Sequence, residues 1–246
     1  MTSARAGWLA VAALCAPCPA QIWPIPHTHD HVQGLEVSSA WFWISAADRR
    51  EKTGWIWRVD RRTLRTVVER ELTQGELYHP GGLQVAGTSL WVPLAEYRPS
   101  SNSVILELDA MTLKERRSFR VQDHIGAVAT DGRTRLLGVN WDARLIYRWN
   151  MGGDLVEAVP NPTPLAIQDM KWIDGALWAG AVGRSVSQGQ CVLAKFDPST
   201  LVLQRGSVLG GSLCYTREGM ALYGGRFFFL PEDEPNSRVY AMGAPR

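Results

Sequence analysis

Apolar and polar residues alternate in short runs along most of the chain, and turn signals separate the runs. Alternation is visible in Val104-Ile105-Leu106-Glu107-Leu108, and Gly87-Thr88 is typical of a hairpin turn. No stretch keeps the 3.6-residue period of an amphipathic helix, and glycines interrupt every candidate. The pattern predicts an all-β chain built from short antiparallel strands.

One turn motif, apolar-Asp-x-x-Thr-Leu, occurs three times in the chain. Its copies are Val59–Leu64, Leu108–Leu113 and Phe196–Leu201. An Asp at the end of a strand accepts hydrogen bonds from backbone N–H groups two or three residues on, and so fixes a turn. The motif therefore marks the same turn in three repeated units.

A second recurring signal marks where each unit begins. When Gly34, Gly82, Ala127, Asp169 and Gly219 are taken as its register, successive units are 48, 45, 42 and 50 residues apart. Units of four strands at this period are typical of propeller blades. Small residues at four of the five register positions suit strands that crowd around a central axis. We therefore predict an all-β, five-bladed β-propeller.

The second unit shows the four expected strands most clearly. We place them at Gly82–Val85, Ser89–Leu94, Ser103–Asp109 and Arg117–Val121. The fifth unit lacks a fourth strand, because nothing remains for one after Ser237–Met242. We predict that Ile22–Ile25, ahead of the first unit, supplies this outer strand and closes the ring. Pro24 and Pro26 limit that segment to an edge position.

Residues 1–20 have the pattern of a secretory signal peptide. Arg5 precedes an apolar run from Gly7 to Ala16, and we place cleavage after Ala20. The run is too short for a transmembrane span, and no later segment is long and apolar enough. We therefore expect an exported protein, periplasmic or extracellular, with a single propeller domain at residues 21–246.

Removal of the leader would leave two cysteines, Cys191 and Cys214. An even pair in an exported protein indicates a disulfide, and the alternative is two buried free thiols. The balance of 26 basic and 24 acidic residues gives no field that would attract nucleic acid or an anionic membrane. We expect a monomer whose partner is a small-molecule ligand or another protein.

The propeller topology predicts which polar residues share one face, here called the mouth. In a four-stranded antiparallel blade, the first strand begins on the same side as the loop between the second and third strands. The starts of the first strands bring His31, His79, His124, Gln168, Asp169, Arg217 and Glu218 to the mouth. The loops bring Asp48, Glu96, Tyr97, Arg98, Asn140, Trp141, Asp142, Arg184, Glu232, Asp233 and Glu234.

Three histidines, His31, His79 and His124, begin repeat units in register. Ring closure should bring them toward one axis, where they would form a divalent metal site or supply a general base. The alternative is that each bonds the backbone of a neighbouring blade and holds the seam. His27 and His29, with His31, offer a separate local metal site.

Charged residues that directly follow apolar strands are the other candidates for chemistry. Glu96 offers a catalytic carboxylate and Arg98 a group that captures an anion, unless the two pair with each other. Glu232 and Asp233 would hold Ca²⁺ or form a solvated loop. Glu218 lies on an innermost strand, which makes it a third catalytic candidate beside Glu96 and His79. The chain has no Gly-x-Ser-x-Gly, phosphate-binding Gly loop, Cys-x-x-Cys or His-Glu-x-x-His motif.

Several motifs resemble an uncharacterised bacterial family of propeller-like proteins, classed as a domain of unknown function. The motifs are His79–Gly82, Trp91–Pro99, Asp123–Val128, Gly138–Trp141 and Leu230–Asp233. The resemblance implies the fold and no assigned activity. More distantly, the Gln-Gly-Leu openings and Asp174–Ala179 are similar to five-bladed glutaminyl cyclases.

Two functions remain open from the sequence. The first is a small-molecule hydrolase, lyase or cyclotransferase that binds a polar or anionic ligand at the mouth. Its ligand would contact a set of mouth residues: Tyr97, Arg98, His124, Asn140, Trp141, Asp169, Arg217, Glu232 and Asp233. The second is a propeller that binds a ligand or a protein on the same face without catalysis.

Overall fold

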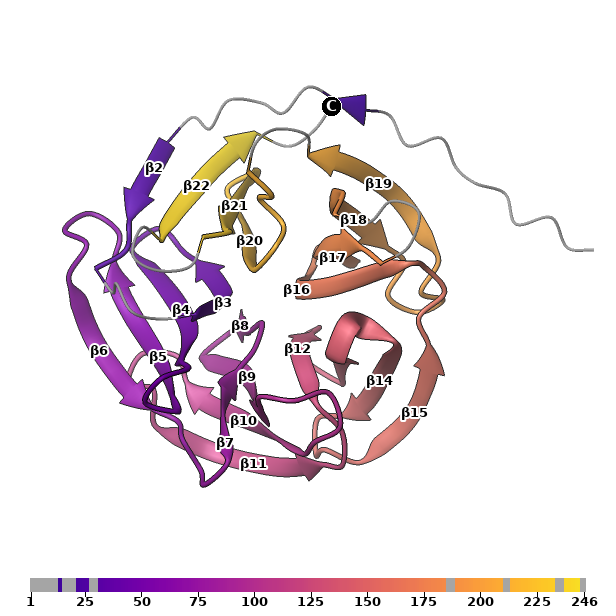
Figure 1. The fold of residues 1–246 in the computed structure, drawn as a ribbon, viewed down its shortest axis with the longest axis horizontal. Helices are drawn as coiled ribbons and strands as arrows, with labels where there is room; N and C mark the ends of the chain where they lie inside the picture. The colour runs from indigo at the N-terminus through magenta and orange to yellow at the C-terminus, as the bar shows by residue number, and fades with distance from the viewer. Residues whose placement is uncertain are drawn as a thin grey trace, which may run out of the picture.

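The computed structural model describes residues 13–14, 21–26, 31–184, 189–209, 213–232 and 237–243. These residues form five sheets arranged as blades around a central axis (Figure 1). The predicted five-bladed β-propeller is therefore confirmed. Most of the predicted signal peptide, residues 1–20, lies outside the described residues. No helix in the described ranges is long and apolar enough to cross a membrane.

In the first three blades the innermost strand comes first in sequence and the outermost strand last. The first blade consists of β3 (His31–Val37), β4 (Trp41–Asp48), β5 (Thr53–Asp60) and β6 (Thr66–Glu71). The second consists of β7 (Leu77–Pro80), β8 (Gln84–Ala86), β9 (Ser89–Glu96), β10 (Ser103–Asp109) and β11 (Glu115–Val121). The third consists of β12 (Ile125–Thr130), β13 (Arg135–Asn140), β14 (Leu145–Asn150) and β15 (Leu155–Pro160).

The last two blades each include a strand from the N-terminal part of the chain. The fourth consists of β16 (Leu165–Ile173), β17 (Ala176–Gly183), β18 (Cys191–Phe196) and β19 (Leu203–Leu209), with β1 (Ala13–Leu14) parallel to β19. The fifth consists of β20 (Gly219–Tyr223), β21 (Arg226–Leu230) and β22 (Arg238–Gly243). β2 (Gln21–Pro24) pairs with β22 and completes this blade, as predicted (Figure 1).

The repeated Asp-x-x-Thr-Leu turn has the same geometry wherever it occurs. Asp60 Oδ1 accepts hydrogen bonds from the backbone N–H of Thr63, at 2.7 Å, and from the Thr63 hydroxyl, at 2.9 Å. The closing Leu64 has a φ of 57°, and Leu113 and Leu201 have a φ of 58°. Each copy therefore places a leucine in the left-handed region, and the aspartate bonds stabilise that turn.

Apolar clusters fill the seams between neighbouring blades, where the sheets pack face to face. Trp23 of β2 packs in the seam between the fifth and first blades. Its ring lies 5.5 Å from the Phe42 ring and 5.8 Å from the Phe228 ring, centroid to centroid. The closing strand therefore contributes to the core as well as to the sheet.

A buried ion pair lies among the inner strands at the centre of the ring. Asp169 and Lys171, both on β16, have fully buried side chains with Nζ 2.5 Å from Oδ1. The other carboxylate oxygen accepts the backbone N–H of Leu35, at 3.2 Å, and of Met220, at 3.0 Å. Asp169 therefore connects the inner strands of the first, fourth and fifth blades.

Two further buried side chains connect the remaining blades. The Gln84 amide oxygen accepts the backbone N–H groups of Thr130, at 2.9 Å, and Trp172, at 3.0 Å. The Glu36 carboxylate accepts the N–H of Val85 at 3.2 Å, and burial raises its pKa to about 7. We call Glu36, Gln84, Asp169 and Lys171 the axial plug.

Candidate functional site

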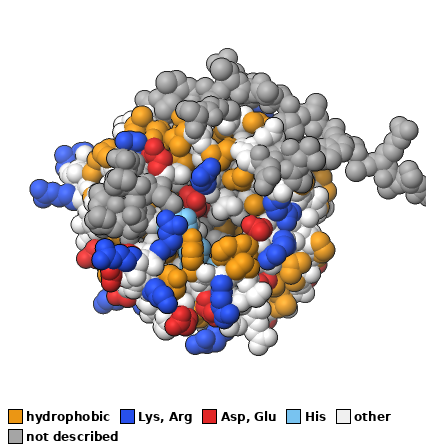
Figure 2. Space-filling model, in the orientation of Figure 1, with side chains coloured by type: hydrophobic (Ala, Val, Ile, Leu, Met, Phe, Trp, Pro, Cys, Tyr) orange, Lys and Arg blue, Asp and Glu red, His pale blue; other side chains and the backbone are white. Residues whose placement is uncertain are grey.

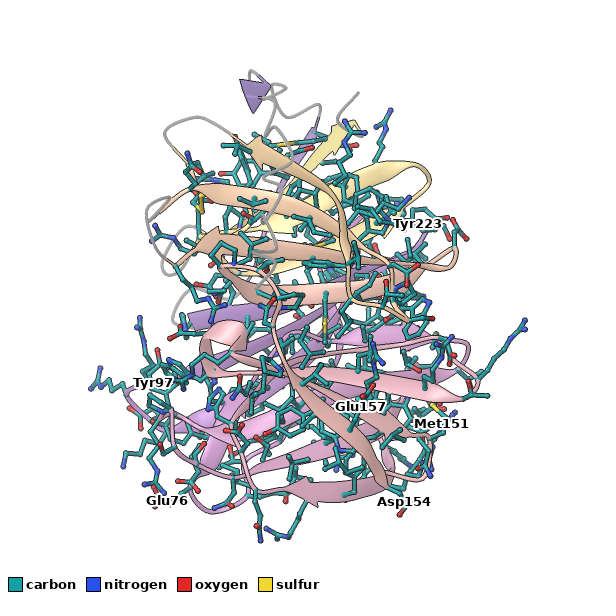
Figure 3. All side chains as sticks on the ribbon, turned by 90° about the vertical axis from the view of Figure 1, so that its right-hand side faces the viewer. Glu76, Tyr97, Met151, Asp154, Glu157 and Tyr223 are labelled. Atoms are coloured by element: carbon teal, nitrogen blue, oxygen red, sulfur yellow. A yellow bond between two sulfur atoms is a disulfide. The ribbon has the colours of Figure 1, made fainter. Side chains whose placement is uncertain are left out.

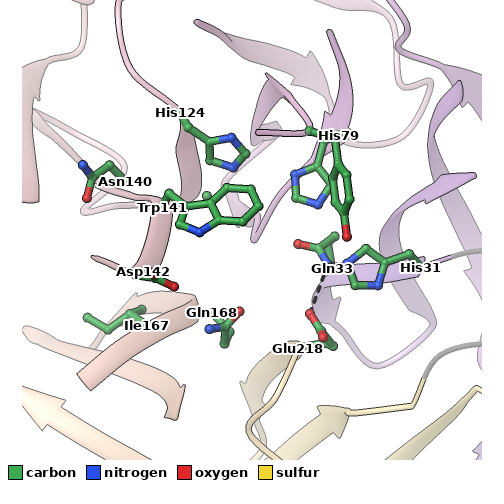
Figure 4. Close-up of a pocket in the computed structure, with 12 residues that line it drawn as sticks. His31, Gln33, His79, His124, Asn140, Trp141, Asp142, Ile167, Gln168 and Glu218 are labelled. Atoms are coloured by element: carbon green, nitrogen blue, oxygen red, sulfur yellow. Dashed lines mark hydrogen bonds between the residues drawn. The ribbon is translucent and has the colours of Figure 1, made fainter. Parts of the chain in front are cut away.

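A cavity of about 180 Å³ opens at the mouth, where the inner strands begin. Its lining residues are His31, Gln33, His79, Tyr97, His124, Gly126, Asn140, Trp141, Asp142, Ile167, Gln168 and Glu218 (Figure 4). Figure 2 shows histidine side chains near the middle of this face. Figure 3 shows Tyr97 on the mouth side and Tyr223 on the opposite side of the molecule. The topology therefore gathers many of the predicted mouth residues.

Irregular pairing of the inner strands shapes the cavity wall. The register between the first two strands of a blade shifts at Gln33 in β3, at Gly126 in β12 and at Gln168 in β16. A bulge of this kind changes the direction in which a side chain points. All three residues line the cavity, and the two glutamines add amide groups to it.

The loop between β13 and β14 supplies Trp141, one of the two aromatic rings at the cavity, and the loop between β9 and β10 supplies the other, Tyr97. Asn140 holds this loop, because its amide oxygen accepts the Leu145 N–H and its amide nitrogen donates to Asp123, both at 2.8 Å. Asp142 has a φ of 58°, in the left-handed region that few non-glycine residues adopt. Asn140 therefore positions Trp141 and Asp142, and both line the cavity.

The three predicted histidines lie in a row. The ring centroids of His31 and His79 are 5.8 Å apart, and those of His79 and His124 are 5.4 Å apart. The Tyr97 ring centroid lies 4.4 Å from that of His79, and the Trp141 centroid lies 4.7 Å from that of His124, both in T-shaped arrangements. The row therefore runs along an aromatic wall, with His79 in its middle (Figure 4).

His124 has a defined hydrogen-bonding role. Its Nδ1 lies 2.9 Å from the Glu96 carbonyl oxygen and 3.1 Å from that of Arg98. A carbonyl oxygen only accepts, so Nδ1 carries the proton and donates. Burial lowers the pKa of His124, so the neutral ring keeps an unprotonated Nε2. This contact fixes the loop that carries Tyr97, as the seam alternative expected.

His79 has no such contact. Both ring nitrogens are buried, and neither has a hydrogen-bond partner among the described residues. Burial, with a smaller contribution from His124 and His31, lowers the pKa of His79 well below its usual value. A neutral imidazole has one donor and one acceptor, and buried polar groups are normally paired. The pairing capacity of His79 is therefore available to a ligand.

Glu218 provides the buried carboxylate of the cavity. It is 8% exposed, and its Oε2 accepts a hydrogen bond from the Gln33 amide nitrogen at 3.0 Å. The same amide nitrogen lies 2.7 Å from His31 Nε2. Gln33 therefore sits between the carboxylate and the first histidine and orients both (Figure 4).

The described residues do not assemble the histidine row into a set of metal ligands. A metal ion lies in the plane of each imidazole that binds it, but the His31 and His79 planes differ by only 20° and the rings are stacked. Within the described residues, no three His, Cys, Asp or Glu side chains are placed to hold a metal ion. His27 and His29 lie outside the described residues.

Glu96 and Arg98 pair with each other outside the cavity. Arg98 Nε lies 2.6 Å from Glu96 Oε2, and the Arg98 side chain is 64% exposed. The Asn102 side chain donates a further hydrogen bond to Glu96 at 3.2 Å. Only Tyr97, between them, reaches the cavity. The pairing alternative for these two residues is therefore the one that the structure shows.

The other predicted residues are divided between the axis and the rim. Asp169 belongs to the axial plug, and Arg217 lines a neighbouring cavity. Glu232 accepts hydrogen bonds from Arg238, at 3.1 Å, and from the Tyr240 hydroxyl, at 2.8 Å. Asp233 lies outside the described residues.

The predicted disulfide between Cys191 and Cys214 is present, with a Cα–Cα distance of 5.4 Å. It joins the start of β18 to the segment that leads into β20. The Thr216 hydroxyl on that segment donates to the Ala181 carbonyl at 2.8 Å. These two contacts anchor the chain just before Glu218.

Gln33 was not predicted as a site residue, although the repeat pattern predicted the innermost strand on which it lies. Its signal was the Gln-Gly-Leu opening, in which a polar residue precedes the small residue of an inner strand. The bulge at this position depends on pairing between strands, which a repeat pattern does not reveal.

Comparisons with solved structures find the same fold at low sequence identity. A glutaminyl cyclase from Myxococcus xanthus matches with a TM-score of 0.69 and 16% identity, over 91% of this chain and 94% of that chain. A protein of unknown function from Bacteroides caccae matches with a TM-score of 0.54 and 10% identity, over 83% and 72%. A luciferin-regenerating enzyme has a TM-score of 0.54 and 12% identity, over 87% and 78%.

At these identities the solved structures establish the fold alone. No curated protein sequence matches the chain significantly. The model of a family of unknown function, DUF6454, matches residues 24–174, which is more than half of the chain. This family match agrees with the resemblance carried by the motifs between His79 and Trp141. The chain is therefore a five-bladed β-propeller that belongs to the DUF6454 family.

Proposed function

We propose that the protein binds a small polar molecule in the mouth cavity and transforms it by acid–base chemistry. The observation that carries the proposal is His79, whose two buried nitrogens have no hydrogen-bond partner in the described chain. Such a group costs free energy unless something pairs with it. A ligand that donates a hydrogen bond to one of these nitrogens, or accepts one from it, would supply a missing bond.

Glu218 is the group best placed to transfer a proton. Its carboxylate is buried and faces the cavity, and Gln33 holds one of its oxygens. A positioned carboxylate within reach of a bound ligand acts as a general base and then as a general acid. The neutral His79 would hold the ligand while Glu218 takes its proton. This scheme fits a hydrolase, a lyase or a cyclotransferase.

The aromatic and charged groups limit what the ligand can be. Tyr97 and Trp141 line the cavity with aromatic rings whose planes differ by 71°, and together they offer an apolar corner for an unsaturated or methylene-bearing group. Glu218 and Asp142 favour ligand atoms that donate hydrogen bonds, such as amine or amide nitrogens. Arg98 is engaged by Glu96, so the capture of an anion at Arg98 is not part of the proposal.

We further propose that the protein works outside the cytoplasm. The Cys191–Cys214 disulfide supports this location, because such bonds persist in oxidising compartments. The signal-peptide pattern of residues 1–20 points to the same route.

The test begins with a thermal-shift screen of L-amino acids, their carboxamides, and glutaminyl dipeptides. The dipeptides are included because a glutaminyl cyclase has this fold. At least one compound should stabilise the wild type and leave His79→Leu unaffected. Equal responses of the wild type and His79→Leu, or no response to any compound, would reject the proposal.

Proton NMR of the stabilising compound then tests the chemistry. The wild type should convert it, and Glu218→Gln should bind it without conversion, because the amide cannot accept the proton. Glu69→Gln, an exposed position on the outer strand β6, is the matched control and should convert it normally.

The second candidate function is binding without catalysis, favoured by the Tyr97 and Trp141 wall at the mouth. A ligand that binds in a His79-dependent manner, and that the wild type leaves chemically unchanged, would establish this alternative.

A further inference from the structure

A second cavity of about 570 Å³ adjoins the first on the side of the fourth blade. Asp142, Gln168 and Glu218 line both cavities, so the two spaces meet at these three side chains. We call the histidine-lined space the inner cavity, the second space the outer cavity, and the three shared residues the neck. The carboxylates at the neck face both spaces.

The sizes of the two cavities suggest different parts of one ligand. Pockets for small molecules usually measure about 300–1,000 Å³. The inner cavity, at about 180 Å³, is below that range, and the outer cavity, at about 570 Å³, is within it. The inner cavity therefore has room for a head group, and the remainder of the ligand would extend through the neck.

The two cavities also differ in charge. Two arginines, Arg184 and Arg217, line the outer cavity, and none of the described residues that line the inner cavity is an arginine. Arg184 is held in place, since its Nη2 donates to the Thr163 carbonyl at 2.6 Å. Much of the remaining outer wall is small, with Gly183 and Gly189 among its residues. The two arginines thus lie on one side of the neck and the histidine row on the other.

We propose that the ligand is an amino acid or a close derivative that spans both cavities. Its carboxylate lies in the outer cavity against Arg217, with Arg184 beside it, and its amino group lies at the neck between Asp142 and Glu218. The polar end of its side chain reaches His79. Arginine suits the outer position because its planar guanidinium pairs with a carboxylate through two hydrogen bonds. This inference rests on the proposed function of the inner cavity.

The probes are the twenty common L-amino acids, compared by calorimetric titration with the carboxamide and the N-acetyl derivative of the tightest binder. The carboxamide lacks the negative charge and the N-acetyl form lacks the positive one. Each should bind the wild type about tenfold more weakly or worse, the loss expected for one charge-assisted contact.

The Arg217→Ala variant tests whether Arg217 contacts the carboxylate of the ligand. This variant should bind the amino acid about tenfold more weakly than the wild type does and should bind the carboxamide with unchanged affinity. Arg226→Ala is the matched control, because Arg226 is also exposed but begins β21 on the face opposite the mouth. It should leave both affinities unchanged.

Three outcomes would overturn the inference. The first is equal affinity for the amino acid and its carboxamide, and the second is no effect of Arg217→Ala. In either case, His79-dependent binding would still support the function of the inner cavity. The third is that no amino acid or derivative binds. If a glutaminyl dipeptide then binds through His79, only the ligand class is wrong, and if nothing binds, the proposed function fails as well.

Discussion

The unpaired His79 makes a prediction at the scale of a single residue. His79→Leu removes two buried polar atoms that have no hydrogen-bond partner among the described residues and puts an apolar group of similar size in their place. An unsatisfied buried group costs about 1–3 kcal/mol, so the variant should unfold with a higher free energy than the wild type. It should also lose ligand binding. Urea denaturation without ligand measures the first effect.

His124 is the matched comparison for this experiment. Its Nδ1 donates to the Glu96 carbonyl at 2.9 Å, so His124→Leu breaks a real contact. That variant should be less stable than the wild type by about 1 kcal/mol or more. If His79→Leu destabilises the protein as His124→Leu does, His79 is a structural residue and the site argument is wrong.

Residue types in the sequence predicted part of this site, and their partners decided the rest. His31, His79 and His124 follow from register alone, because equivalent positions on inner strands meet at one axis. In the sequence, Glu96 and Glu218 look equivalent, because each is a carboxylate close to an arginine. Only the three-dimensional contacts show that Glu96 pairs with Arg98 while Glu218 faces the cavity. Such pairings depend on side-chain direction, which spacing does not specify.

At the scale of elements, the disulfide and the Thr216 hydroxyl anchor the segment that carries Arg217 and Glu218. Replacing both Cys191 and Cys214 by serine should lower the unfolding free energy by about 3 kcal/mol in the chain-entropy model. Ligand affinity should fall as well, because Glu218 loses its anchor. Denaturation and titration of the double variant measure the two effects. Unchanged affinity would show that Thr216 alone positions the segment.

The strands themselves were largely predictable. The Asp-x-x-Thr-Leu turns fixed where third strands end, and the predicted strand Ser103–Asp109 matches β10. The prediction for the first strand of the second blade was less accurate, because the chain forms two strands there, β7 and β8. Between them Gly82 N–H donates to the Gly126 carbonyl of the third blade at 2.8 Å. A contact between blades therefore replaces pairing within the blade.

At the scale of the whole molecule, β2 holds the first and last blades together. Trp23→Ala should cost about 3–5 kcal/mol of unfolding free energy, since it empties the seam between Phe42 and Phe228. Ile22→Ala is the control on the same strand, where the side chain is 48% exposed, and should change stability by less than about 0.5 kcal/mol. Thermal unfolding of the pair compares them, and equal losses would contradict the packing role of β2.

The axial plug predicts how stability depends on pH. Burial raises the pKa of Glu36 from 4.5 to about 7, so the folded state binds this proton more tightly than the unfolded chain. The stabilisation is complete below pH 4.5 and is lost as the pH rises to about 7. The lowered pKa of His79 acts in the opposite direction, because its neutral form is favoured in the folded state.

The Glu36→Gln variant separates the pH-dependent contribution of Glu36 from that of His79. The difference in unfolding free energy between this variant and the wild type should change between pH 4.5 and 7 and stay constant above that range. Denaturation at several pH values measures the difference. A difference that does not vary with pH would show that Glu36 titrates normally.

The pairing of β2 with β22 has a consequence for how the protein is made. β2 emerges from the ribosome before every strand of the first four blades except β1, yet its partner emerges after all of them. During synthesis Trp23 therefore has no finished seam to enter, and the ring stays open until the last strand is complete. Contacts between such distant segments form slowly, so closing the ring is the step we expect to come last in folding.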